Sequence, residues 1–145
     1  MLNKIGLAAV MVTMFAAPAL AGNGSCGSMP VPPAMPSADD IAHKSPEAAA
    51  TAKHNAFLDV KNWQSSLNDY RNCLDALMAT DKQKMSNLDP GKDADKISAL
   101  QAEMDAATGS HDSSVDSEER VVNDFHAVQA AYCIRNDVDR STCPK

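Results

Sequence analysis

The sequence predicts an all-α fold, an antiparallel two-helix hairpin with long helices over about residues 45–88 and 93–136. Three observations support this prediction. Apolar residues recur at alternating steps of three and four through both segments, which is the heptad spacing of packed helices. An Asp-Pro-Gly turn separates the segments. The chain has 145 residues and 4 cysteines, which fits one small domain stapled by disulfides.

The N-terminal segment, residues 1–21, has the pattern of a secretory signal peptide. Lys4 is followed by an apolar run over residues 5–20, and the run ends in the small-residue cleavage pattern Ala-Leu-Ala. We therefore expect export to the periplasm or the extracellular space, with cleavage after Ala21, rather than a membrane anchor. No other stretch of the sequence is long and apolar enough to span a bilayer.

The remaining chain is acidic. Removing Lys4, one of 13 basic residues, leaves 12 basic against 19 acidic side chains, a net charge of −7. Such a domain repels nucleic acids and anionic lipid headgroups, so we expect neither as a partner. Cations and basic partners are compatible with this charge.

A Gly-, Ser- and Pro-rich segment, residues 22–44, precedes the first helix. Residues 29–36 read Met-Pro-Val-Pro-Pro-Ala-Met-Pro, which favours an extended polyproline conformation. The segment is either a disordered lead or an ordered strap. We favour the strap, because a disulfide through Cys26 would tie it down and Val31 and the two methionines would bury apolar surface.

The first long helix is predicted to start after Ser45, an N-cap residue that is followed by Pro46 and by Glu47 in the first turn. At about 40 residues it would be on the order of 60 Å long. We call the positions that face the other helix the seam. The predicted seam of this helix is Ala56, Val60, Trp63, Leu67, Tyr70, Leu74 and Leu77.

Residues 89–92 are predicted to form the turn, and Asp93 to cap the second helix. The seam of this helix keeps its spacing without a slip, which favours one continuous helix. A break near Gly109 is the alternative, because residues 116–119 also form a capping box. Residues 137–145 would follow as a C-terminal tail. The predicted seam is Ile97, Leu100, Met104, Ala107, His111, Ser114, Glu118, Val121, Phe125, Val128 and Tyr132.

Two helices joined by a short turn must be antiparallel neighbours. With the turn centred near residue 90, facing residues should have numbers that sum to roughly 180. Phe57 is then expected near Phe125.

The same rule orders the cysteines. Cys133 lies opposite about residue 47, far from Cys73. Of the three possible connectivities we therefore predict Cys26–Cys73, which lets the strap run back along the first helix, and Cys133–Cys143, which closes the tail. In the chain-entropy model these bonds stabilise the fold by roughly 4 and roughly 3 kcal/mol. A bare hairpin buries too little apolar surface, and dimerisation into a four-helix bundle would be another remedy.

Three polar residues interrupt the seam of the second helix: His111, Ser114 and Glu118. They would either line a polar pocket beside Trp63 and Tyr70 or form a polar layer that fixes the register of the helices. A third interpretation is a face that turns to solvent. We favour the layer or the solvent-facing arrangement over the pocket.

Three carboxylates, those of Asp112, Asp116 and Glu119, share one face of a continuous second helix. Carboxylate oxygens are ligands for divalent cations, although this spacing fits no EF-hand. The two interpretations are a metal site and a solvated acidic face, and we favour the second.

The sequence contains no motif of a catalytic or cofactor site. It has no phosphate-binding Gly-rich loop, no nucleophile elbow, no H-E-x-x-H and no C-x-x-C. Two long helices also offer no deep concave pocket. We therefore expect no catalytic residue, no cofactor and a non-enzymatic function.

A Cys- and Pro-rich lead is followed by Tyr-Arg-Asn-Cys-Leu at residues 70–74, and later by His, Val-Asp-Ser-Glu-Glu and Phe within residues 111–125. In these residues the chain resembles uncharacterised small exported α-helical proteins of proteobacteria, which share the lead and the mid-helix Y-x-x-C-L. The resemblance supports the Cys26–Cys73 bond. Because the group has no known activity, the resemblance assigns no functional residue.

We expect an exported envelope protein that acts as a helical protein-interaction or structural module, presenting a helix face to another protein or to a second copy. The alternatives are a periplasmic divalent-cation-binding protein that uses the acidic face, and a holdase-type chaperone. An exposed apolar stripe would favour an interaction module. The candidate stripe residues are Leu58, Val122, Ala131 and Ile134.

Overall fold

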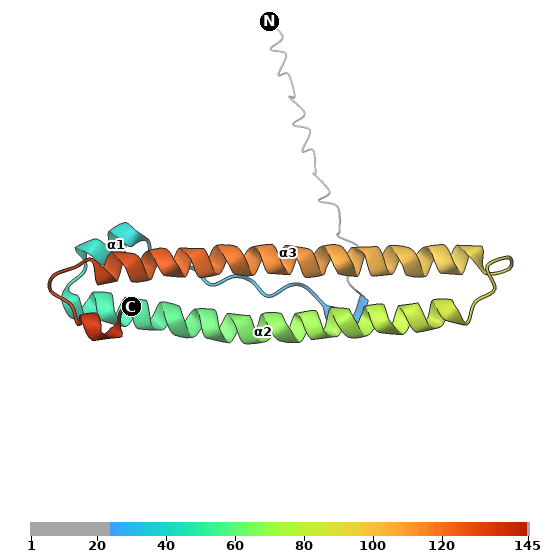
Figure 1. The fold of residues 1–145 in the computed structure, drawn as a ribbon, viewed down its shortest axis with the longest axis horizontal. Coiled ribbons are helices and arrows are strands. Elements are labelled where there is room, and N and C mark those ends of the chain that lie inside the picture. The colour runs from blue at the N-terminus through green and yellow to red at the C-terminus, as the bar shows by residue number, and fades with distance from the viewer. Residues whose placement is uncertain (1–23, 145) are drawn as a thin grey trace, which may run out of the picture.

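The structure, a computed structural model, describes residues 24–144. The predicted signal peptide and its cleavage site lie outside these residues. The described chain contains helices and no strand, as predicted (Figure 1). In order, the elements are the 3₁₀ helix η1 (Gly24–Cys26), α1 (Ala38–His43), α2 (Pro46–Ser86), α3 (Ala94–Cys133) and the 3₁₀ helix η2 (Arg140–Thr142).

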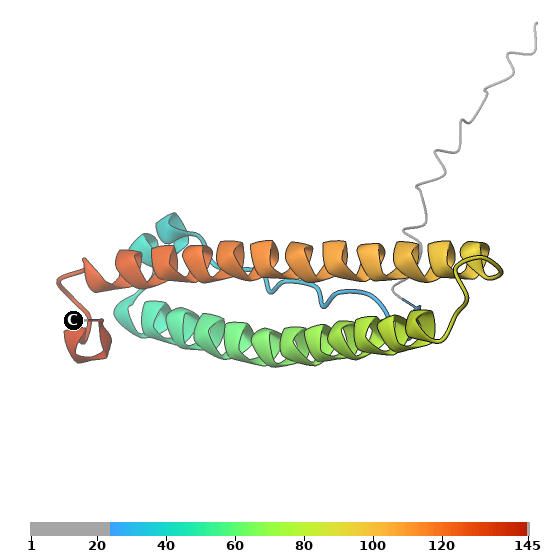
Figure 2. The ribbon, with the colours of Figure 1, turned by 45° about the vertical axis from the view of Figure 1, so that its right-hand side comes forward.

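The two long helices lie side by side and antiparallel in both views (Figures 1 and 2). The Oγ atom of Ser45 caps α2 by accepting a hydrogen bond of 3.3 Å from the backbone N–H of Ala48, as the Ser-Pro-Glu start predicts. Helix α3 is continuous through Gly109, as the uninterrupted heptad spacing predicts, and the alternative of a break at Gly109 is wrong. Within residues 24–144, neither long helix has an apolar stretch sufficient to cross a membrane.

The predicted cap at Asp93 is only partly right. Asp93 precedes α3, but its carboxylate caps no N–H group of that helix. It accepts instead from Lys96 Nζ at 2.6 Å and from the backbone N–H of Asp89 at 3.3 Å. The Asp89 carboxylate accepts from the N–H of Gly91 at 2.8 Å. Both aspartates therefore close the turn rather than cap the helix.

The Pro-rich strap is ordered and runs along the pair of long helices (Figures 1 and 2). Residues 29–37 belong to no helix or strand, but the prediction of an extended segment as far as residue 44 was wrong, because α1 lies within it. Ser37 and Asp40 form a reciprocal capping box that starts this helix. Arg135 Nη1 donates to the carbonyl oxygens of Ile41, at 2.6 Å, and Ala42, at 3.0 Å.

Both predicted disulfides are present. Cys26–Cys73 joins the strap to α2 with the Cα atoms 5.6 Å apart, and Cys133–Cys143 joins the tail to the end of α3 with the Cα atoms 5.9 Å apart. The tail also contacts α2, because Lys53 Nζ donates to Thr142 Oγ1 at 2.8 Å.

The core divides into two clusters along the rod. The larger cluster lies between α2 and α3, and Cys26, Met29 and Met35 of the strap segment pack against it. The smaller cluster lies where α1 meets the open ends of the long helices, and Met35 packs against it as well. The larger cluster contains Ala56, Val60, Trp63, Leu67, Tyr70, Leu74, Ala107, Val121 and Phe125. The smaller contains Ile41, Ala49, Val128, Ala131 and Tyr132.

Burial decreases toward the turn. Leu74 and Ala107 are fully buried. In the part of the chain from Leu74 through the turn to Ala107, no other apolar seam residue is fully buried. The one buried side chain in that stretch is Asp81. The described strap starts beside Cys73, so it covers the seam only on the side of Cys73 away from the turn. The half-buried apolar residues near the turn are Leu77, Met78, Met85, Leu88, Ile97, Leu100 and Met104.

Candidate interaction surface

The pair of long helices forms a layer with two faces, and the strap covers only one of them. Cys73, which binds the strap, and Arg71 are two positions apart and therefore lie about 200° apart around α2. We call the face on the Arg71 side the open face. Residues spaced by seven share one edge of a packed helix. The open face is thus made of Phe57, Gln64, Arg71, Met78 and Met85 of α2, together with Val115 and Val122 of α3.

A polar layer crosses the middle of the open face. Arg71 Nη1 contacts Glu118 Oε2 at 2.6 Å, and Arg71 Nε donates to Ser114 Oγ at 2.7 Å. Gln64 Nε2 donates to Glu118 Oε1 at 2.8 Å. The hydrogen bond from Arg71 holds the pKa of Glu118 below its ordinary value, although burial opposes this shift and the bond from Gln64 adds to it.

Of the three polar seam residues, Ser114 and Glu118 take part in this layer. Ser114 is fully buried, and its hydroxyl donates to the backbone carbonyl of His111 at 2.6 Å. The ring of His111 does not join the layer, because its Nδ1 lies 3.8 Å from Asp112 Oδ1 on the flank of the helix. Trp63 faces the strap, where its Nε1 donates to the Pro30 carbonyl at 3.1 Å.

Arg71 and Gln64, the two α2 residues that complete the layer, were not among the predicted seam residues. The facing rule contains a signal for both, because each number, added to that of Glu118, gives a sum close to the one expected of facing residues. Their positions beside the apolar seam of α2 do not interrupt its heptad pattern, so that pattern alone does not single them out.

The apolar side chains of the open face are partly exposed to solvent. Phe57 and Val115 each expose 45% of their surface. The ring of Phe57 packs on that of Phe125 with centroids 6.0 Å apart, as the facing rule predicts. Met78 contacts α3 through its sulfur, which accepts from Thr108 Oγ1 at 3.4 Å. The face therefore alternates partly buried apolar groups with one polar layer.

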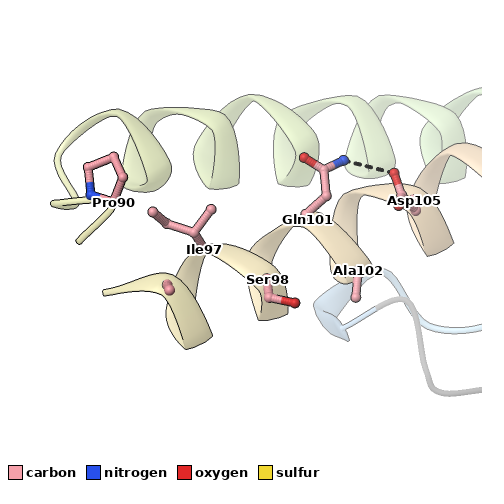
Figure 3. A pocket seen from close by; sticks show the side chains of 7 residues that line it. Pro90, Ile97, Ser98, Gln101, Ala102 and Asp105 are labelled. Carbon is pink, nitrogen blue, oxygen red and sulfur yellow. Dashed lines mark hydrogen bonds between the residues drawn. The ribbon is translucent and has the colours of Figure 1, made fainter. Parts of the chain in front are cut away.

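A shallow depression lies on α3 beside the turn (Figure 3). It measures about 530 Å³ and is open to solvent. Ile97 reaches toward Pro90 on one side, and Gln101 donates to Asp105 at 2.9 Å on the other. The remaining lining residues are Ala94, Ser98 and Ala102.

An acidic row borders the open face on α3. We call Asp105, Asp112, Asp116 and Glu119 the acidic edge; all four are exposed. Within residues 24–144, none of the four lies within ion-pairing distance of a lysine or arginine.

The candidate metal ligands Asp112, Asp116 and Glu119 are exposed on α3. Across the described chain, no three histidine, cysteine, aspartate or glutamate side chains are arranged to hold a metal ion. Asp116 and Glu119 line a surface depression together with Arg120, which places a cationic side chain beside them.

The predicted apolar stripe beside the seam is interrupted. Leu58 and Ile134 are exposed, by 44% and 76%, and Val122 is half-buried. Ala131 is buried, because it packs in the cluster that contains Ile41 of α1. The four candidate residues therefore do not form one exposed stripe. Exposed apolar side chains occur on the open face, at Phe57 and Val115, and also outside it, at Leu58, Ile134 and Val31. Val31 of the strap, which we expected to be buried, exposes 87% of its surface.

A scan against models of protein families, a search of curated proteins and a search of solved structures each found no match to the chain.

Proposed function

We propose that the protein is an exported, non-enzymatic interaction module of the cell envelope that holds a helix of another protein on its open face. The observation that carries the proposal is the unequal covering of the hairpin. The strap, fixed by the Cys26–Cys73 bond, covers one face, while Phe57 and Val115 on the other each expose 45% of their surface. A two-helix layer covered on one side has room for a third helix on the other.

The shape and chemistry of the open face support a helix rather than an extended peptide as the ligand. We call the line along which α2 and α3 meet on the open face the groove. An amphipathic helix can pack along such a line with residues spaced by three and four. Met78 and Met85 suit this role, because methionine side chains adapt to the shape of a partner. Burying each Å² of apolar surface there would contribute about 25 cal/mol.

Two observations support an oxidising compartment. All 4 cysteines are paired in two disulfides, and such bonds persist in the periplasm or outside the cell. The signal-peptide pattern at residues 1–21 predicts the same location.

The experiment compares protein captured from an envelope extract by three baits. The first is the wild-type mature chain, and the second is the open-face variant Met85→Glu/Val115→Glu. The third is the matched control Leu58→Glu/Ile134→Glu, which places the same charges at exposed apolar residues outside the open face. Circular dichroism first checks that all three baits are folded.

Quantitative mass spectrometry should find at least one protein that the wild type and the control retain and that the open-face variant loses. Equal capture by all three baits would contradict the proposal, as would loss with the control alone.

A further inference from the structure

From the charges that border the open face we infer that the helix it receives is basic along the flank that lies over α3. This inference rests on the proposed function and adds the chemistry of the partner. It concerns the acidic edge, which borders the groove on one side only.

The acidic edge runs parallel to the groove. Three of its carboxylates each come directly after a residue of the seam or of the open face. These pairs are His111 and Asp112, Val115 and Asp116, and Glu118 and Glu119. Because successive residues of a helix are about 100° apart, each carboxylate lies about 100° farther around α3 than the residue before it. All four carboxylates of the edge are exposed and unpaired with lysine or arginine within the described chain. A helix in the groove would therefore place one flank beside a row of four carboxylates, of which Asp116 and Glu119 have Arg120 close to them.

The other border of the groove does not share this charge. The corresponding exposed row of α2 is Lys61, Asn68, Asp75 and Lys82, with two positive charges against one negative. The groove is therefore negative along α3 and slightly positive along α2. This asymmetry favours a partner helix whose lysines and arginines lie on one flank, and it fixes which flank faces α3.

Charge also separates this partner from a second copy of the chain. The full sequence carries a formal net charge of −6, so two copies repel each other at long range. The α2 row of a second copy would offer only two basic residues, Lys61 and Lys82. A basic helix neutralises the acidic edge better and associates faster at low salt.

The test uses three amphipathic peptides as probes, with the same leucine stripe on a helix of about 20 residues. The Lys peptide carries lysine along one flank and glutamine along the other. The Glu peptide replaces each lysine with glutamate, and the Gln peptide replaces each lysine with glutamine. Fluorescence anisotropy measures binding to the wild-type mature chain, to Asp112→Lys/Asp116→Lys/Glu119→Lys and to a control. The control Asp59→Lys/Asp69→Lys/Asp124→Lys changes the net charge equally at exposed residues outside the acidic edge and the α2 row.

The wild type should bind the Lys peptide at least about tenfold more tightly than the Gln peptide, and raising the salt concentration should reduce this ratio. The acidic-edge variant should lose that preference and bind the Glu peptide, while the control should keep most of it. The salt dependence of the wild type tests the inference even if the acidic-edge variant does not fold.

The inference fails if the Lys peptide does not bind, if the Gln and Glu peptides bind as well as the Lys peptide, or if the control loses as much affinity as the acidic-edge variant. It also fails if sedimentation shows a dimer that Met85→Glu/Val115→Glu dissociates, because a second copy would then occupy the face. If the Gln peptide binds and the variant Met85→Glu/Val115→Glu abolishes this binding, the proposed function remains supported even when the charge inference fails. The proposed function is contradicted separately, by the capture experiment.

Discussion

The indole nitrogen of Trp63 donates a hydrogen bond of 3.1 Å to the carbonyl oxygen of Pro30. This bond joins a buried aromatic side chain of α2 to the Pro-rich part of the strap, where the prolines have no N–H groups of their own. The strap is therefore held at three kinds of contact: the disulfide at Cys26, this hydrogen bond, and the packing of Met29 and Met35.

Replacing Trp63 with phenylalanine removes the hydrogen bond and keeps most of the apolar contact. We expect the free energy of unfolding to fall by about 1 to 3 kcal/mol, since both a hydrogen bond and part of a buried ring are lost. Urea unfolding followed by circular dichroism measures the change. The control Phe57→Leu alters a half-exposed aromatic residue on the open face and should cost less. An unchanged urea midpoint for Trp63→Phe would show that the strap does not depend on this contact.

Removing the Cys26–Cys73 bond should loosen the strap. In the double variant Cys26→Ala/Cys73→Ala the free energy of unfolding should fall by roughly 4 kcal/mol, against roughly 3 kcal/mol for Cys133→Ala/Cys143→Ala, because the first bond closes the longer loop. Trp63 is the only tryptophan, so its fluorescence reports on the strap directly. The emission should shift to longer wavelength in the first variant and stay in place in the second. Equal melting of the first variant and the wild type would refute the strap model.

The Arg71–Glu118 pair should make stability depend on pH. Because the folded-state pKa of Glu118 is lowered, its contribution to stability is fully present above the ordinary pKa of an unfolded glutamate and is lost as the pH falls through the lower folded value. Glu118→Gln should cost about 2 kcal/mol at pH 7 and should flatten the loss of stability between about pH 5 and pH 3. Urea unfolding at several pH values, with Glu119→Gln as the exposed control, tests this. Parallel pH profiles for wild type and Glu118→Gln would contradict it.

Asp81 should destabilise the fold. It occupies a seam position and is fully buried, its Oδ1 contacts Lys84 Nζ at 2.6 Å, and its Oδ2 has no hydrogen-bond partner in the structure. Replacing a buried, half-satisfied charge with an apolar residue is often neutral or stabilising. We expect Asp81→Leu to raise the free energy of unfolding by about 1 to 2 kcal/mol, while Asp75→Leu on the surface changes it by less than about 0.5 kcal/mol. A large loss of stability in Asp81→Leu would show that the charge is needed.

Much of the fold could be predicted because it follows from the spacing of apolar residues and from the distance that a segment of given length can span. Heptad spacing predicts both long helices and the approach of Phe57 to Phe125, and the length of the strap allows the Cys26–Cys73 bond. These features depend on where apolar residues lie along the chain, which a sequence shows directly.

The remaining features depend on contacts between residues far apart in the sequence. Helix α1 has a local signal, the Ser37–Asp40 capping box, but its six residues are held by Arg135, which a sequence pattern does not place. The open face likewise depends on which side the strap takes, and that follows from the position of Cys73 on α2. The buried Asp81 lies where the heptad pattern predicts an apolar residue, so the pattern alone does not predict that an aspartate is buried there.

The central claim, that the open face holds a partner, is tested most directly inside the cell by placing a photo-crosslinking amino acid at single positions. Positions 85 and 115 lie on the open face, while positions 58 and 134 are exposed apolar residues outside it. If a partner lies on the open face, positions 85 and 115 should give a covalent adduct with another protein and positions 58 and 134 should give none. Adducts from positions 58 and 134 alone, or equally from all four positions, would contradict it.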